Sequence, residues 1–129
     1  MDDMSNDTPR KILIIDDSQL AIVMLHDGLR QNGFEVLIAS DGDEGLQLLK
    51  HESPDLIILD MRLPSMSGRE FLKELKGLSL DPPVPVIVLT ASEPIQDIVL
   101  DDIVRACYQK PTPIAQLVAK INECLESKD

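Results

Sequence analysis

The amino-acid sequence predicts an α/β fold, in which a parallel sheet of five strands is covered by helices on both faces. Two observations lead to this prediction. Short apolar runs alternate with helical patterns along the chain, and these runs are almost unbroken, as in strands that are buried on both faces. The chain has 129 residues, 43% hydrophobic and 27% charged, which is enough for one soluble domain with its own core.

The first βα unit follows a polar segment, residues 1–9, which we expect to be a flexible tail. The run 12–15 is continuously apolar and predicts the first strand. Ser18 is a good N-cap for a helix that continues to about residue 32, and Gly33 provides a left-handed stop. Residues 34–39 predict the second strand.

The second and third units are marked by similar signals. Asp41 is expected to cap a second helix that ends before Pro54. The apolar run 56–59 predicts the third strand. A third helix is expected over 69–76 and is ended by Gly77.

The last two units are predicted with less regular signals. Residues 84–89 predict the fourth strand. The segment 92–94 (Ser-Glu-Pro) is expected to open a fourth helix, and a fifth strand is expected near residues 106–109. Thr112 is expected to cap the last helix, with Pro113 in its first turn. Apolar residues at helical spacing give this helix a stripe that faces a core: Ile114, Leu117, Val118, Ile121 and Leu125.

Polar residues stand where four of the predicted strands end: Asp16, Asp17, Asp60, Thr90 and Lys110. The carboxyl ends of parallel strands share one edge of a sheet, so we expect these side chains to meet. Each residue alone would be an ordinary cap, strand end or loop residue, but the joint placement points to a site.

Three adjacent carboxylates repel each other, and Lys110 offsets only one charge. An all-oxygen carboxylate site suits Mg²⁺ or Mn²⁺. A carboxylate beside such a cation can attack phosphorus and form an aspartyl phosphate, whose charge Lys110 and Thr90 would help to stabilise. The constellation therefore predicts a phosphoryl acceptor.

Composition excludes several other classes of function. The net charge of −11 argues against nucleic acid or an anionic membrane as a direct partner. No apolar run approaches the ~20 residues that span a bilayer, and the polar start is unlike a signal peptide, so a cytoplasmic location is expected. Cys107 and Cys124 show no metal-ligand spacing and are expected to be reduced, small hydrophobic residues.

Five stretches carry a resemblance to a known family: KILIIDDSQLA, ASDGDEGLQLL, PDLIILDMRLPSMSG, PVIVLTA and the dipeptide Lys110-Pro111. With these stretches, residues 10–129 resemble a receiver domain of response regulators in two-component signal transduction systems, of the chemotaxis-regulator-like kind. The resemblance implies a flavodoxin-like (βα)5 three-layer sandwich with strand order 2-1-3-4-5.

The resemblance also implies roles for individual residues. Asp60 would be the phosphoacceptor, modified to 4-aspartylphosphate. The Mg²⁺ (or Mn²⁺) ligands would be Asp16, Asp17, Asp60 and the backbone carbonyl of Arg62. Thr90 and Lys110 would contact the phosphoryl group, and the Lys110-Pro111 peptide would be cis.

The implied partners follow from the same family. The phosphodonor would be a phosphohistidine on a sensor histidine kinase or a histidine phosphotransfer protein, and the output would go to a downstream protein target. Such a domain catalyses only its own phosphorylation and dephosphorylation and is not a conventional enzyme.

The chain departs from the family pattern between the fourth and fifth strands. The aromatic residue usual three positions before the lysine is replaced by Cys107, and Tyr108 stands one place later, where a strand would turn it to the opposite face. The Thr90 to Lys110 interval is about two residues shorter than usual, and the customary Gly-Ala is replaced in the segment 104–106. The switch candidates are therefore Thr90, Cys107 and Tyr108.

Three alternative functions would each require different residues. A pseudo-receiver that binds a partner without phosphorylation is compatible with the altered region near Cys107. A phosphohydrolase of the haloacid-dehalogenase type would need a second aspartate two residues after Asp60, where this chain has Arg62. A flavin-binding flavodoxin would need a phosphate-binding loop after the first strand, and no Ser/Thr/Gly-rich loop stands there.

Overall fold

The computed structural model describes residues 8–91 and 95–126, which form one five-stranded parallel sheet with the order β2-β1-β3-β4-β5. This confirms the predicted parallel sheet and its strand order. The predicted tail falls mostly on residues 1–7, outside the described residues. The strands are β1 Lys11–Ile15, β2 Glu35–Ala39, β3 Leu56–Leu59, β4 Val86–Thr90 and β5 Val104–Gln109. The helices are α1 Gln19–Gln31, α2 Gly42–Glu52, α3 Gly68–Gly77, the 3₁₀ turn η2 Ile95–Asp97, and α4 Ile114–Glu126.

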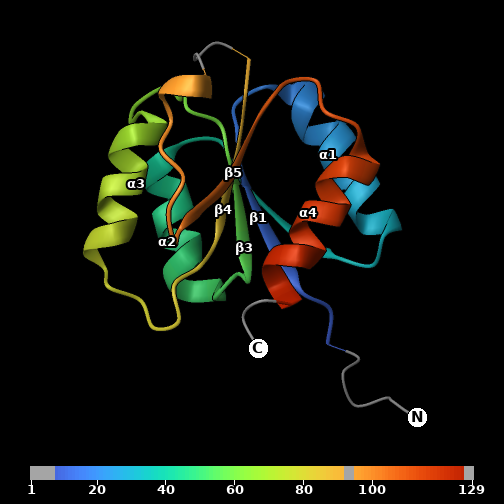
Figure 1. Ribbon diagram of the computed structural model, residues 1–129, viewed down its shortest axis with the longest axis horizontal. Coiled ribbons are helices and arrows are strands. Elements are labelled where there is room, and N and C mark those ends of the chain that lie inside the picture. Colours follow the sequence, from blue (N-terminus) through green and yellow to red (C-terminus); the bar gives the residue numbers. More distant parts are fainter. Residues whose placement is uncertain (1–7, 92–94, 127–129) are drawn as a thin grey trace.

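Two helical layers cover the sheet, α1 with α4 on one face and α2 with α3 on the other (Figure 1). Successive strand residues point to opposite faces, so Ile12 and Ile14 pack under α1 and α4, whereas Leu13 and Ile15 pack under α2 and α3. Because both faces are covered, β1, β3 and β4 are almost wholly buried. This explains the unbroken apolar runs in the sequence.

Two of the predicted capping residues, Ser18 and Asp41, lie where the sequence placed them. The Ser18 hydroxyl accepts the Ala21 N–H, and the Asp41 carboxylate accepts the Glu44 N–H. Gly33 has φ 91°, the left-handed conformation that ends a helix most easily with glycine. These local hydrogen bonds fix the helix starts next to the ends of the strands, which is where the polar residues stand.

The prediction of a fourth helix from residues 92–94 was wrong as far as the structure describes it. Residues 92–94 lie outside the described residues, and beyond them only the short η2 turn and an irregular segment, 98–103, lead to β5. Ile98, Val99 and Ile103 are β-branched and poor helix formers. Asp101 also bonds backbone N–H groups of its own segment and so competes with a helix. Within the described residues, the fourth unit of the (βα)5 pattern therefore contains only the η2 turn between β4 and β5.

Two strand boundaries and one cap also differ from the prediction. β4 begins at Val86 rather than residue 84, because Pro85 has no N–H for a sheet ladder. β5 begins at Val104, two residues early. The Thr112 hydroxyl donates to the Gln109 carbonyl at 2.7 Å, and α4 starts at Ile114 with the Pro113 carbonyl accepting its first N–H bonds.

A bulge in β5 accounts for the face that each of its residues occupies. Val86 pairs with Val104, but the next residue of β4, Ile87, pairs with Ala106, so Arg105 is an additional residue in β5. Val104 consequently packs on the α2/α3 face and Ala106 on the α1/α4 face, although two residues separate them. Because of the additional residue Arg105, each later residue of β5 points to the opposite face of the sheet from the one it would occupy in a regular strand.

Candidate functional site

The candidate site lies at the carboxyl edge of the sheet, as predicted. Asp16 directly follows β1, Asp60 follows β3, Thr90 ends β4 and Lys110 follows β5. Backbone bonds continue the ladder at these positions, from Asp60 N to Ile15 O and from Lys110 N to Thr90 O, each at 3.0 Å. The sheet itself therefore fixes the relative positions of the four residues.

Lys110 and Thr90 both contact the Asp60 carboxylate. The Lys110 Nζ lies 3.0 Å from Asp60 Oδ2 and 2.6 Å from Asp16 Oδ2. The Thr90 hydroxyl, which is fully buried, donates to Asp60 Oδ1 at 2.9 Å. The structure thus brings together four of the residues that the sequence singled out.

Backbone N–H groups hold the two buried carboxylates from the other side. Arg62 N donates to Asp60 Oδ1 at 3.1 Å, and Ser18 N donates to Asp16 Oδ1 at 2.9 Å. Asp16 and Asp60 are only 2% and 7% exposed. From the sequence, Ser18 was predicted only as a helix cap. The bond from its backbone N–H to Asp16 could not be predicted, because any residue type has a backbone N–H at this position.

Burial and the ion pair act in opposite directions on the charges of the site. Burial raises the pKa of Asp16, and the nearby Asp60 charge adds to this, while the Lys110 and Ser18 hydrogen bonds only partly offset it. Burial alone would lower the pKa of Lys110, but its hydrogen bonds with Asp16 and Asp60 outweigh this effect and raise it. The negative charges of Asp16 and Asp60 are therefore only partly offset by the Lys110 ammonium.

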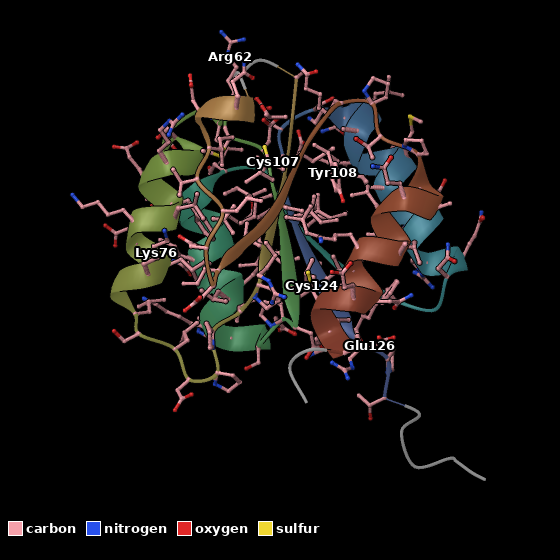
Figure 2. The ribbon with its side chains drawn as sticks, viewed as in Figure 1. Arg62, Lys76, Cys107, Tyr108, Cys124 and Glu126 are labelled. Atoms are coloured by element: carbon pink, nitrogen blue, oxygen red, sulfur yellow. The ribbon has the colours of Figure 1, made fainter. Side chains whose placement is uncertain are left out.

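Asp16, Asp17 and Asp60 fit a divalent cation. Each offers a carboxylate oxygen, and these oxygens lie within 4.8 Å of one another. Hard cations such as Mg²⁺ and Mn²⁺ prefer such an oxygen donor set. The role of the Arg62 carbonyl stays a prediction; its side chain is exposed and extends away from the sheet (Figure 2).

An open pocket of about 450 Å³ leads to Asp60. Its walls come from Asp17 and Ser18 after β1, residues 62–64 after β3, Ala91 after β4, and Lys110. Asp60 is buried from bulk water but borders this space. The predicted cis peptide between Lys110 and Pro111 is also confirmed.

The two switch candidates on β5 point in opposite directions. Cys107 packs against the α2/α3 core cluster and Tyr108 against the α1/α4 cluster (Figure 2). The expected difference in face is therefore confirmed. Cys107 is a free thiol whose pKa is raised by burial, and it faces the side on which residues 98–103 run.

The fold and the carboxylate edge together are those of the receiver domains of two-component systems. The chain belongs to the response regulator receiver domain family, which it matches over residues 12–122. The expected family is thereby confirmed, and so is its flavodoxin-like architecture.

Known proteins of this family resemble the chain along most of its length. The alkaline phosphatase synthesis transcriptional regulatory protein PhoP of Bacillus subtilis is 40% identical over 91 residues, 70% of this chain and 37% of PhoP. The transcriptional regulatory protein PrrA of Mycobacterium tuberculosis is 34% identical over 123 residues, 94% of this chain and 52% of PrrA. The chain thus spans about half the length, or less, of these curated relatives.

A solved receiver structure has the same fold. The CheY-like response regulator receiver domain protein of Methanospirillum hungatei JF-1 superimposes with a TM-score of 0.83 at 31% identity, covering 94% of this chain and 97% of that one. Within residues 8–91 and 95–126, no helix is both long and apolar enough to cross a bilayer.

Proposed function

We propose that the chain is the phosphorylated switch of a two-component phosphorelay in the cytoplasm. Asp60 accepts a phosphoryl group from a phosphohistidine on a sensor histidine kinase or histidine phosphotransfer protein, and the domain then controls a downstream protein partner. The observation that carries this proposal is the set of contacts at Asp60, a buried carboxylate that borders an open pocket and is contacted by Thr90 and Lys110. The domain would catalyse no other reaction.

In the transfer step, an oxygen of Asp60 forms a bond to phosphorus while the bond between phosphorus and the donor imidazole nitrogen breaks. The imidazole leaves with the electron pair of that bond. A divalent cation held by Asp16, Asp17 and Asp60 would offset negative charge on the transferring group. Attack of water on phosphorus later regenerates the carboxylate and releases inorganic phosphate.

Lys110 and Thr90 are placed to act on the phosphoryl oxygens. Their present bonds end on the Asp60 carboxylate, at 3.0 Å and 2.9 Å. After phosphorylation, we expect both groups to bond phosphoryl oxygens, which extend beyond the carboxylate. Thr90 ends β4, so its displacement would be passed to the chain that follows, up to residue 103.

The direct test is chemical labelling followed by intact-mass measurement. With Mg²⁺ and acetyl phosphate, we expect a mass increase of one phosphoryl group that is lost on mild base treatment. The adduct should be absent in Asp60→Asn and when EDTA removes the metal. Asp43→Asn, a change at an exposed carboxylate on α2, is the matched control and should be labelled like the wild type.

A protein that acetyl phosphate does not label would contradict the proposal. If no adduct forms under conditions that label another receiver domain, the chain is a pseudo-receiver that binds a partner without phosphorylation. An adduct that persists in Asp60→Asn would place the phosphoryl group on another residue.

A further inference from the structure

The side chain of Met66 holds the β3–α3 connection, residues 60–67, against the start of α2. A Cβ added to Gly42, the first residue of α2, would lie 2.7 Å from the Met66 Sδ and 3.0 Å from its Cβ and Cγ. The thioether therefore lies directly on the backbone of the buried Gly42. Met66 also packs against the α2/α3 core cluster, whose two helices lie side by side in Figure 1.

The same connection reaches the phosphoacceptor site. At one end, the Arg62 N–H donates to Asp60 Oδ1 at 3.1 Å. At the other end, the Ser67 hydroxyl accepts the Glu70 N–H at 3.1 Å, and the Glu70 carboxylate accepts the Ser67 N–H at 2.9 Å. The connection is thus held at Asp60 and at the start of α3, and between these ends Met66 contacts α2. A displacement of Met66 would therefore be passed to Arg62.

Met66 is also accessible to a small oxidant in solvent. The methionines of the described residues are Met24, Met61 and Met66. Met61 is only 3% exposed, whereas Met66 is partly exposed. Met24 is 56% exposed, but it lies on α1, on the other side of the sheet from the α2/α3 core cluster. Met66 thus combines access from solvent with a packing role next to the site.

We propose that Met66 is an oxidative modification site that controls phosphorylation of Asp60. An electron pair of the Met66 Sδ attacks one oxygen of hydrogen peroxide and the O–O bond breaks. The second oxygen leaves with the electron pair of that bond and takes up the proton of the transferred oxygen, which gives water and methionine sulfoxide. Sulfur is oxidised and the peroxide is reduced. The inference rests on the proposed function for the statement that Asp60 is phosphorylated.

The sulfoxide would not keep the contact with Gly42. Its oxygen is polar and needs both space and hydrogen-bond donors, whereas the thioether is packed against a helix backbone that leaves no room for a Cβ. Movement of the connection would displace the Arg62 N–H from Asp60. Because a misplacement of about 1 Å can slow a reaction by about 10²-fold, we expect labelling by acetyl phosphate to slow roughly tenfold.

Peroxide treatment of the full chain, followed by acetyl phosphate labelling, tests this site. Intact mass counts the oxygen atoms added, and peptide mapping locates them. We expect a sulfoxide at Met66 to accompany slower labelling and changed amide chemical shifts at Gly42 and Gly68. A sulfoxide at Met24 should accompany neither change. Methionine sulfoxide reductases should restore the original labelling rate.

Three variants separate Met66 from the other oxidisable groups. Met66→Leu keeps a similar apolar volume without the thioether, so peroxide should leave its labelling rate unchanged. Met66→Gln places a polar group at the same position and should be labelled slowly without peroxide. Met24→Leu removes the exposed thioether of α1 and should remain sensitive to peroxide.

Three outcomes would overturn the inference: no sulfoxide at Met66, a Met66 sulfoxide with an unchanged labelling rate, or equal slowing of Met66→Leu and the wild type by peroxide. If Met66→Gln does not fold, the comparison of oxidised wild type with oxidised Met66→Leu gives the same decision. An untreated chain that is not labelled contradicts the phosphorelay instead. In that case, peroxide-induced shifts at Gly42 and Gly68 that are absent in Met66→Leu support the oxidation site, and their absence in the wild type contradicts it.

Discussion

At the scale of single residues, the buried Asp60 carboxylate is stabilised by hydrogen-bond donors that replace the water it loses on folding. It is 7% exposed and receives hydrogen bonds from the Thr90 hydroxyl, the Arg62 N–H and the Lys110 ammonium. Burying a carboxylate without such partners would be strongly unfavourable. The same groups that make a buried Asp60 possible are those that we propose to contact a phosphoryl group.

The Thr90 hydroxyl can be tested apart from any labelling reaction. Thr90→Val keeps the shape of the side chain but removes the donor to Asp60, so the free energy of unfolding should fall by about 1.5–3 kcal/mol, the usual contribution of a hydrogen bond to a charged group. Urea denaturation at neutral pH in the presence of EDTA measures this difference in the free energy of unfolding. Thr90→Ser keeps the hydroxyl and is the control for the donor. Equal stability of Thr90→Val and the wild type would show that the bond contributes nothing net.

At the scale of elements, the β3–α3 connection holds Asp60 and Arg62 by a close backbone approach. Gly68, the first residue of α3, donates its N–H to the Met61 carbonyl at 2.9 Å. A Cβ at Gly68 would lie 2.5 Å from the Met61 Cα and 3.0 Å from the Asp60 carbonyl oxygen. Glycine is therefore required here by the proximity of another backbone.

Gly68→Ala should consequently disturb both stability and the site. We expect a loss of about 1–3 kcal/mol in the free energy of unfolding, typical of overpacking, together with slower labelling of Asp60 by acetyl phosphate. Gly77→Ala is the matched control at the other end of α3, where a Cβ would meet nothing within 4 Å. It should stabilise slightly, since alanine is the better helix former. A Gly68→Ala protein that is as stable and as readily labelled as the wild type would contradict this account.

The segment between β4 and β5 shows where element prediction failed. Ser-Glu-Pro at 92–94 is a common helix start, but nine residues further on Asp101 satisfies backbone N–H groups that a helix would have used differently. The β5 bulge at Arg105 was likewise not predicted. A bulge is decided by how two strands fit together, and neighbouring residues in the chain carry little signal for it.

At the scale of the whole molecule, the Lys76–Asp101 ion pair links α3 to the segment that leads into β5, and it is sensitive to pH and salt. Burial alone would raise the pKa of Asp101, but the Lys76 ammonium and the N–H groups of Val104 and Ile103 lower it below its usual range. A lowered folded-state pKa means that Asp101 contributes stability above its unfolded pKa of ~3.9. That contribution is lost as the pH falls through the folded value.

Asp101→Asn and Lys76→Met should therefore destabilise the protein in a pH-dependent way. The Lys76 and Asp101 side chains are 45% and 36% exposed, so we expect a modest loss of about 0.2–1 kcal/mol near pH 7, and a smaller loss in high salt. For Asp101→Asn the difference from wild type should stay constant down to about pH 5 and shrink below about pH 4. Urea denaturation across this range measures it, with Asp102→Asn as the neighbouring control. A deficit that is the same at pH 3 and pH 7 would exclude a role for the Asp101 charge.

The sequence by itself determined the parallel sheet, its order through the family resemblance, most helix starts, and the residues that gather at the carboxyl edge. These features depend on local patterns: unbroken apolar runs, Ser18 and Asp41 as caps, and polar residues such as Asp60 at strand ends. A parallel sheet then brings the strand ends together without further information.

Only the tertiary structure decided the path between β4 and β5, which core cluster Cys107 and Tyr108 each contact, the requirement for glycine at residue 68, and the exposure of Val99 and Leu100. Each of these depends on contacts between segments far apart in the chain, such as Lys76 with Asp101. Because such contacts form only when the layers pack, they leave no periodic trace in the sequence, and the region that distinguishes this receiver was the part that local patterns predicted least well.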